Sequence, residues 1–399
     1  MLKTFIYGEQ DALPWVLRRV FKLRHGQIHF HGIWTGTVGE PSDLNVDIHV
    51  HNAELIDLII KNGVLGAAEG YIRGDWSSDD LVQLIQLLAR NRDVLDKINQ
   101  NIIVQASQVA LKSWYKTRQN TLKGSRKNIA EHYDLSNDFF KLFLDSSMMY
   151  SSAVFKDTHT SLEQASDNKK ELICQKLQLK PLDHLVEIGS GWGGFAIYAA
   201  QHYGCQVTTI TISQAQYDEA VKRIEAAGLS HRIDVQLKDY RLLDGKFDKL
   251  VSIEMIEAVG EQYLPTYFEK CRTLLKPHGL ALIQAITIED ARYKKALHTV
   301  DYIKRYIFPG SFIPCISVLT QSASEQKLRL KQLDDIGQSY AQTLHHWRER
   351  FLAAQGQVKA LGFDDNFIRM WDFYLCYCEG GFKEGVISDV HMLFEVSPY

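Results

Sequence analysis

Residues 185–195 constrain the fold of this chain more than any other stretch: they read Leu-Val-Glu-Ile-Gly-Ser-Gly-Trp-Gly-Gly-Phe. An apolar run leads into four glycines within six positions, and a helical pattern follows directly. Glycine permits a sharp turn and lets a ligand approach the backbone where a Cβ would block it. Free N–H groups at the start of the following helix favour an electron-rich ligand group. The stretch therefore predicts a strand, a ligand-binding turn and a helix.

Strands and helices continue to alternate after this turn. A capping box, with Ser213 at the cap and Gln216 three residues later, predicts the start of the next helix. Such alternation is typical of an α/β fold with a mostly parallel sheet covered on both faces. We predict strands over 206–211, 233–237, 247–253, 280–288 and 391–396, and helices over 213–227 and 263–275.

The first 112 residues predict a separate, small α+β domain. Apolar and polar residues alternate over 26–33 and 45–51, the period of half-buried strands. Apolar residues three and four apart predict helices over 54–61, 81–88 and 94–111. Between them, 63–76 is a stretch of small residues ending in turns.

Four histidines on these two strands raise the question of a metal site. His29 and His31, and likewise His49 and His51, share a strand face. We see no carboxylate or cysteine partner near them and expect ordinary solvent-facing histidines, with no metal.

Composition excludes several classes of protein. The net charge of -3 over 399 residues gives no global basicity that would suit nucleic acid. No apolar run approaches the roughly 20 residues of a spanning helix, and the first 20 residues lack a signal-peptide core. The six cysteines are scattered and indicate reduced thiols. We expect a cytoplasmic protein.

A basic segment over 113–127 separates the N-terminal domain from the rest. It contains lysines, arginines, Trp114 and Tyr115, and no acidic residue. A solvated linker is one interpretation. The other is a surface for anionic phospholipid headgroups, with aromatic side chains at the interface.

The glycine turn lacks the features of two common nucleotide sites. A dinucleotide site expects an acidic residue or an arginine about 20 positions after the glycines, but 208–213 reads Thr-Thr-Ile-Thr-Ile-Ser. A phosphate-binding Gly-Lys-Ser/Thr is also missing from the sequence. A hydroxyl-rich strand end followed by Asp239 suits S-adenosylmethionine (SAM), with the Asp239 carboxylate near the adenine amino group.

Segments along nearly the whole chain match the motifs of one known family in order: 66–76, 128–145, 149–155, 187–194, 209–216, 239–241, 253–260, 302–310 and 371–394. Through these segments the sequence resembles the cyclopropane-fatty-acyl-phospholipid synthases, in their longer bacterial form with an N-terminal domain. The resemblance implies a Rossmann-like SAM-dependent methyltransferase with a seven-stranded sheet, over 128–399.

The resemblance also implies residue roles. The methionine end of SAM would contact Tyr150, Ser151, Gly189 and Gly191. Its ribose and adenine end would contact Thr211, Ile212, Gln216 and Asp239.

The family's catalytic pocket holds a bicarbonate ion, which makes bicarbonate a candidate cofactor here. Glu257 and Tyr340 match two residues near that ion, Ile286 matches an isoleucine lining its site, and Cys378 matches a cysteine near the acyl channel. Two positions depart from the family: Ser152 replaces a cysteine and Gln284 replaces a histidine. Gln284 cannot take up a proton at neutral pH, so it cannot take over the proton-handling role of that histidine.

The chemistry that the family implies needs few groups. A sulfonium methyl is a strong electrophile, and a cis double bond attacks it without a general base. Aromatic faces stabilise the resulting carbocation, and this half of the chain is rich in them: Phe308, Phe312, Tyr340, Trp371 and Phe373. Ring closure then requires a base, either Glu257 or a bicarbonate ion that it holds.

We therefore expect a cyclopropane synthase acting on unsaturated phospholipid acyl chains, peripherally associated with the inner membrane. The sequence is compatible with a homodimer. We expect the N-terminal domain to contact lipid, the membrane or a second copy of the chain. One alternative is a methyltransferase of the same fold whose product is methyl-branched. Another is a non-catalytic lipid-binding protein with a vestigial SAM site.

Overall fold

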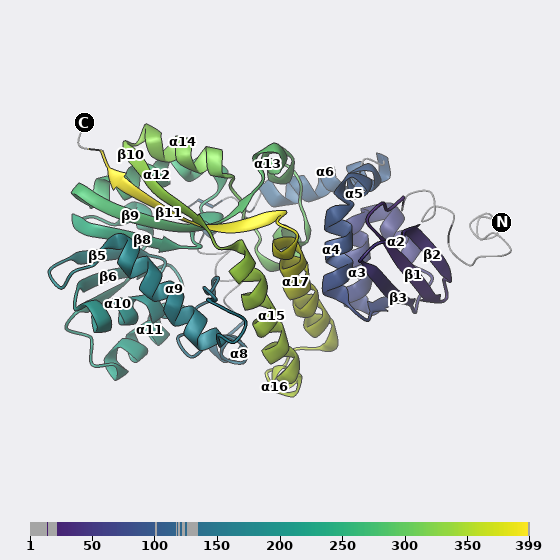
Figure 1. Cartoon of the computed structure of the whole chain (residues 1–399), viewed down its shortest axis with the longest axis horizontal. Helices are drawn as coiled ribbons and strands as arrows, with labels where there is room; N and C mark the ends of the chain where they lie inside the picture. Colours follow the sequence, from purple (N-terminus) through teal and green to yellow (C-terminus); the bar gives the residue numbers. More distant parts are fainter. Residues whose placement is uncertain are drawn as a thin grey trace. The chain divides into compact units, whose positions relative to one another are not determined.

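The computed structural model describes residue 14 and residues 22–99, 102–116, 118, 120–121, 124–125 and 135–397. The chain forms two compact units, described separately below (Figure 1). Two segments from the C-terminal half belong to the N-terminal unit, a division that the sequence did not predict. The first unit is Met1–Thr117, Thr299–Ile307 and Leu352–Val386, and the second is Arg118–His298, Phe308–Phe351 and Ile387–Tyr399.

A seven-stranded sheet forms the centre of the second unit, in the order β10-β11-β9-β8-β5-β6-β7. From β9 to β7 all neighbours are parallel, whereas β11 runs antiparallel to both β9 and β10. The predicted mostly parallel seven-stranded sheet is confirmed. Its strands are β5 (His184–Ile188), β6 (Gln206–Thr211), β7 (Ile233–Leu237), β8 (Phe247–Ile253), β9 (Leu275–Ile288), β10 (Leu328–Asp335) and β11 (Ile387–Val396).

Helices cover both faces of this sheet (Figure 1). Successive strand residues point to opposite faces, so Leu185 and Val186 belong to different apolar clusters. The cluster of Leu185 includes α9 (Leu162–Leu177), α10 (Gly194–Tyr203) and α11 (Gln214–Ala226). The cluster of Val186 includes α12 (Leu264–Leu274) and α14 (Ile316–Glu325). The remaining helical elements of this unit are α8 (Asn137–Lys141), η2 (Tyr240–Leu242), η3 (Ile256–Ala258), η4 (Glu261–Tyr263), α13 (Asp290–Leu297) and α15 (Gly337–Ala353).

The first unit is an α+β fold around a four-stranded sheet in the order β2-β1-β3-β4. Only β1 and β3 are parallel among its pairs. Its strands are β1 (Gly26–Gly32), β2 (Gly36–Glu40), β3 (Asn45–Val50) and β4 (Trp76–Ser78). Its helices are α2 (Leu55–Asn62), α3 (Val64–Arg73), α4 (Leu81–Arg90), α5 (Arg92–Asn99), α6 (Ile102–Lys116), the π-helical turn η5 (Ile303–Ile307), α16 (Gln355–Ala360) and α17 (Asp365–Lys383).

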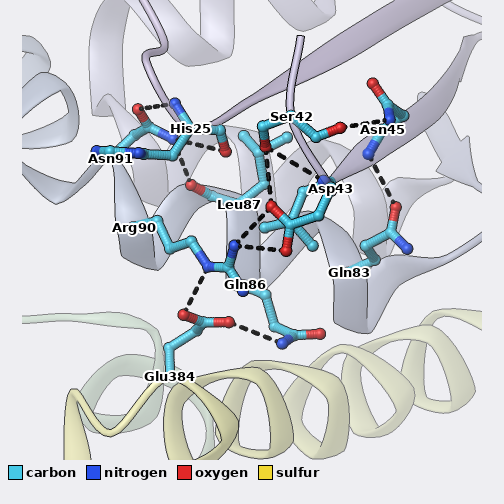
Figure 2. Close-up of polar contacts among 11 residues, drawn as sticks. His25, Ser42, Asp43, Asn45, Gln83, Gln86, Leu87, Arg90, Asn91 and Glu384 are labelled. Carbon is cyan, nitrogen blue, oxygen red and sulfur yellow. Dashed lines mark hydrogen bonds and ion pairs between the residues drawn. The ribbon is translucent and has the colours of Figure 1, made fainter. Parts of the chain in front are cut away.

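Polar contacts join α4 to the segment that follows α17 (Figure 2). The Arg90 guanidinium donates to both Asp43 carboxylate oxygens at 2.9 Å and to Glu384 at 2.8 Å. Gln86 donates to the other Glu384 oxygen at 2.8 Å. These contacts tie the segment after α17 to the N-terminal part of the first unit.

Several elements differ from the sequence prediction, among them the helix predicted over 94–111, which is instead the two helices α5 and α6. Residues 64–73 form the helix α3 rather than turns, because their small side chains allow close packing on α2: a Cβ on Gly66 would lie 2.0 Å from the Leu58 carbonyl oxygen. Strand β10 was not predicted, because most of its side chains are exposed and its apolar alternation breaks after Leu330, where the pairing register shifts.

The four strand histidines have nearby partners, and two of these are carboxylates, which corrects the expectation of none. His31 contacts Asp47 at 2.6 Å, and His49 contacts Asp79 at 3.1 Å. His29 and His51 contact threonine and serine hydroxyls. Within the described residues, no group of three or more potential ligands could hold a metal ion.

None of the helices in the described part of the chain combines the length and apolar character needed to cross a membrane. Residues 117, 119, 122, 123, 126 and 127 of the basic segment, and residues 128–134 of the family resemblance, fall outside the described residues.

Candidate active site

The glycine turn after β5 has the conformation that its sequence predicts. Gly189, Gly191 and Gly193 have φ angles of 97°, 47° and 84°, in the left-handed region that favours glycine. The N–H groups of Gly189 and Ser190 donate to the Ile210 carbonyl at 3.0 and 2.8 Å, which fixes the turn to β6.

Two glycines of this turn show different spatial requirements. A Cβ on Gly191 would meet nothing within 4 Å, so the backbone faces open space at this point. A Cβ on Gly194 would lie only 2.4 Å from the Ser147 carbonyl oxygen. Gly191 thus leaves room for a ligand against the turn, whereas Gly194 is required for packing. This arrangement fits the predicted contact of SAM with Gly189 and Gly191.

The predicted ribose and adenine contacts lie after β6 and β7. The Thr211 hydroxyl donates to the Gln216 side-chain oxygen at 2.8 Å. The next residue after Thr211, Ile212, is half-buried. Ser213 caps α11 by accepting the Gln216 N–H at 3.3 Å. The reciprocal half of the predicted capping box is not formed, because the Gln216 side chain binds Thr211.

Asp239 is buried directly after β7 and already has a partner. Its carboxylate accepts from the Arg241 guanidinium at 2.8 and 2.6 Å and from the Arg241 N–H at 3.0 Å. These hydrogen bonds from Arg241 orient the carboxylate. A carboxylate has about four acceptor positions, so Asp239 can still accept one hydrogen bond from an amino group.

Tyr150 and Ser151 lie in the segment after α8. Tyr150 packs among aromatic rings, whereas Ser151 contacts a buried lysine. The Tyr150 ring packs against Phe140 and Trp347, with centroids 5.1 and 5.3 Å away. The Ser151 hydroxyl accepts a hydrogen bond from the ammonium group of Lys169, which is fully buried. Burial lowers the pKa of Lys169 to about 8, although Glu254 and Asp389 oppose this shift.

The carboxylate of Glu254, directly after β8, is the centre of a polar cluster. Its Oε1 accepts the Ser152 N–H at 2.8 Å and the Gln284 amide at 2.7 Å. Its Oε2 accepts the Tyr340 hydroxyl at 2.7 Å. The structure therefore brings three predicted catalytic residues together, around a carboxylate that the sequence analysis did not select.

Glu257 and Ile286 form a second contact beside this cluster. The Ile286 N–H donates to Glu257 Oε1 at 2.6 Å, while Glu257 Oε2 is buried without a hydrogen-bond partner among the described residues. Burial, followed by the charge of Glu254, raises the pKa of Glu257 to about 8. Burial and the neighbouring negative charge both favour the neutral form of Glu257.

Asp389, on β11, is a third buried carboxyl group and shares Gln284 with Glu254. The Gln284 amide donates to Asp389 Oδ2 at 2.7 Å. Burial and the charge of Glu254 raise the pKa of Asp389 well above its usual range. Burial also raises the pKa of Glu254, but Lys169 and the N–H and O–H donors favour its ionised form. Of the three carboxyl groups, Glu254 is the one that accepts hydrogen bonds from three different residues.

Cys378 belongs to the first unit, on α17. Burial and the charge of Asp301 raise the pKa of its thiol far above neutral. A protonated thiol is neither a base nor a nucleophile, so Cys378 is a lining residue at most.

The residues predicted to hold bicarbonate do not fit that ion. Ser152, Gln284 and Tyr340 direct their donors at Glu254, and Ile286 directs its N–H at Glu257. A bound anion would have to compete with carboxylates of the protein for each donor.

Sequence reasoning missed Glu254, Asp389 and Lys169. Glu254 follows a predicted strand by one residue, where ligand clefts of parallel sheets open, so its position was a signal that could have found it. Asp389 was missed because the last strand was predicted to start two residues later. Lys169 carries no signal, since lysines on helices are usually exposed.

Known proteins resemble this chain over most of its length. The model of the mycolic acid cyclopropane synthetase family matches residues 120–392. Tuberculostearic acid methyltransferase UfaA1 of Mycobacterium tuberculosis is 36% identical over 90% of this chain and 85% of its own length. The cyclopropane-fatty-acyl-phospholipid synthase of Escherichia coli K12 is 35% identical over 84% of each chain.

Solved structures give the same result. The cyclopropane synthase MmaA2 from Mycobacterium tuberculosis has a TM-score of 0.64 and 26% identity, covering 68% of this chain and 98% of its own. Mycolic acid cyclopropane synthase CmaA1 complexed with SAH and CTAB has a TM-score of 0.63 and 28% identity, with the same coverage. The chain therefore belongs to the mycolic acid cyclopropane synthetase family and is a SAM-dependent methyltransferase.

Proposed function

We propose that this enzyme transfers a carbon from SAM to the cis double bond of an unsaturated acyl chain in a membrane phospholipid, and that a cyclopropane ring closes. The observation that carries the proposal is the group of buried carboxyls after β8, at the edge of the sheet that also holds the glycine turn. A Cβ on Gly189 would lie 3.3 Å from Met255, the residue after Glu254, so turn and carboxyls are adjacent.

The residues of the second unit support each requirement of this reaction. The open backbone face at Gly191, with Thr211, Gln216 and Asp239, suits SAM, which supplies an electrophilic methyl group when bound. Methyl attack by an alkene needs proximity and exclusion of water rather than a base. The protein then has to stabilise a carbocation and remove a proton from the added carbon.

Aromatic rings beside the carboxyl cluster suit the carbocation. Trp347 packs on Tyr150 at 5.3 Å and on Tyr340 at 6.1 Å between ring centroids. Phe308 lies 6.4 Å from Tyr150. Ring faces attract a cation without forming a bond to it, an effect of about 0.5–2 kcal/mol per ring. Trp371 and Phe373 belong to the first unit and add nothing to this argument.

A methyl-branched product is the second candidate. It is favoured by the 36% identity to a tuberculostearic acid methyltransferase over most of both chains. In that case the same carbocation is resolved without a ring, by hydride shift and proton loss elsewhere.

Purified enzyme with SAM and vesicles of cis-unsaturated phospholipid tests the proposal. We expect SAM consumption that requires the double bond, and a ring-containing lipid by mass spectrometry. Vesicles of saturated phospholipid are the matched control. A chain that binds vesicles and never consumes SAM would instead be a lipid-binding protein with a vestigial SAM site.

The remaining expectations concern location and assembly. We propose that the enzyme works in the cytoplasm at the inner membrane, and that residues 113–127 bind its anionic surface. The N-terminal domain is proposed as a lipid, membrane or homodimer contact. Vesicle sedimentation and light scattering test these two points separately.

A further inference from the structure

We infer that Glu254 is a built-in carboxylate base that takes the place of the bicarbonate ion in this enzyme. The inference rests on the proposed function, since it assigns the group that removes a proton from the added carbon. Four donors that would bind such an ion converge instead on side-chain carboxylates, three of them on Glu254.

The geometry around Glu254 is that of an anion site already filled. The Ser152 N–H, the Gln284 amide and the Tyr340 hydroxyl lie 2.7–2.8 Å from its two oxygens. Charge-assisted hydrogen bonds of this kind are among the stronger ones in proteins. Displacing the carboxylate by an external ion would leave it buried and unpaired, which costs several kcal/mol.

The charges of the cluster argue in the same direction. Asp389 and Glu257 face Glu254 from β11 and η3, and Lys169 on α9 is the cation that acts most strongly on Glu254. The single ammonium group of Lys169, together with the donors around Glu254, can stabilise the negative charge of one carboxylate. A bicarbonate ion would add a second negative charge beside the first, within a few ångströms and away from water.

The backbone conformation at Glu254 is a further, independent indication that its side chain has a functional role. Its φ is 46°, in the left-handed region, where a residue with a Cβ is disfavoured by about 1–2 kcal/mol relative to glycine. Strained non-glycine residues concentrate at functional sites. A carboxylate held at this position despite the strain indicates that the side chain itself is needed there.

The proposed step balances as follows. The alkene electron pair forms a bond to the methyl carbon while the carbon–sulfur bond breaks, and its electrons stay on sulfur. A cation is left on the acyl chain. Glu254 then takes a proton from the added carbon, and the electrons of that C–H bond form the second bond of the ring. Glu254 ends as a neutral carboxylic acid. The positive charge that began on the sulfonium has passed to the acyl cation and then left it with the proton.

The test compares the wild type with Glu254→Gly and Glu254→Gln, each in CO2-free buffer and with millimolar bicarbonate or formate. Wild-type activity should not respond to either ion. Glu254→Gly should lose about 100-fold or more in kcat, keep its folding temperature because the backbone strain is relieved, and recover activity with bicarbonate. Glu254→Gln should lose activity without recovery, because its amide still fills the site. His278→Gly, at an exposed residue with φ of 60°, is the control for the backbone change.

Calorimetry adds a readout that does not depend on turnover: bicarbonate should bind Glu254→Gly and not the wild type. Active wild type that requires bicarbonate, or Glu254→Gly with normal activity in CO2-free buffer, would overturn the inference while leaving the proposed function intact. Wild type that modifies no unsaturated lipid in any buffer would overturn the proposed function instead.

Discussion

Gln284 and His391 lie directly opposite each other on β9 and β11, and His391 Nε2 donates to the Gln284 side-chain oxygen at 3.2 Å. The Lys176 ammonium donates to His391 Nδ1 at 3.0 Å, and a lysine can only donate. Nε2 must therefore carry the hydrogen, which turns the Gln284 NH2 group toward Glu254 and Asp389. A histidine thus orients the glutamine that stands at the family's histidine position.

Replacing His391 should therefore impair catalysis through Gln284. In His391→Phe the Gln284 amide can rotate and present its oxygen to Glu254. We expect kcat to fall about 10- to 100-fold, as for other misplaced catalytic groups, with an unchanged KM for SAM. His391→Gln keeps a donor and should restore most of the rate. Equal kcat in His391→Phe and wild type would show that Gln284 needs no such orientation.

Tyr340→Phe should change the pH dependence of the rate. The Tyr340 hydroxyl stabilises the ionised form of Glu254, and its loss raises the pKa of a base that must be deprotonated to act. The acid limb of the pH–rate profile should move to higher pH by about one unit. Tyr293→Phe, which removes another buried hydroxyl of the second unit, is the matched control. An unmoved acid limb in Tyr340→Phe would remove Glu254 from the proton-removing step.

Gly191→Val should abolish SAM binding without unfolding the protein. The valine side chain enters the open space in front of the turn, and the left-handed backbone costs about 1–2 kcal/mol of stability. Gly228→Val is the control, since Gly228 also has a positive φ of 68° and nothing within 4 Å of its Cβ position. Calorimetry with SAM should separate the two variants. Unchanged affinity in Gly191→Val would contradict the cofactor site.

Stability should fall as pH rises from about 5 toward 8, and Glu187 should account for part of the slope. Burial raises the pKa of Glu187 from 4.5 to about 8, although Thr209 donates to its carboxyl group at 2.5 Å. Between these values the folded state keeps a proton that the unfolded state has released, so higher pH favours unfolding. Urea unfolding at several pH values should show a slope reduced by about 1.4 kcal/mol per pH unit in Glu187→Gln. An identical slope in both proteins would show that Glu187 is ionised when folded.

The basic segment 113–127 gives a prediction that rests on sequence alone. Lys123, Arg126 and Lys127 changed to glutamine should weaken binding to anionic vesicles by about 1 kcal/mol per residue, and high salt should have the same effect on the wild type. Sedimentation with neutral vesicles is the control. Binding that ignores both lipid charge and salt would leave this segment as a linker.

Much of the second unit could be predicted from sequence because its elements depend on local patterns. The glycine turn and strands β6, β7 and β8 were predicted with their observed bounds. The active-site partners could not be predicted in the same way. Glu254, Gln284 and Asp389 meet because β8, β9 and β11 are neighbours in the sheet, and a single sequence does not specify that order. The first unit shows the same limit, since Arg90 contacts Glu384 from nearly 300 residues away.

The most direct test of the central claim is the product formed from SAM that carries a fully deuterated methyl group. Purified enzyme with this SAM and vesicles of cis-monounsaturated phospholipid should yield a cyclopropane lipid that retains two of the three deuterium atoms, because a base has removed the third from the added carbon. A lipid that retains all three deuterium atoms as a methyl branch would contradict proton removal from that carbon, and with it the role of the carboxylate cluster.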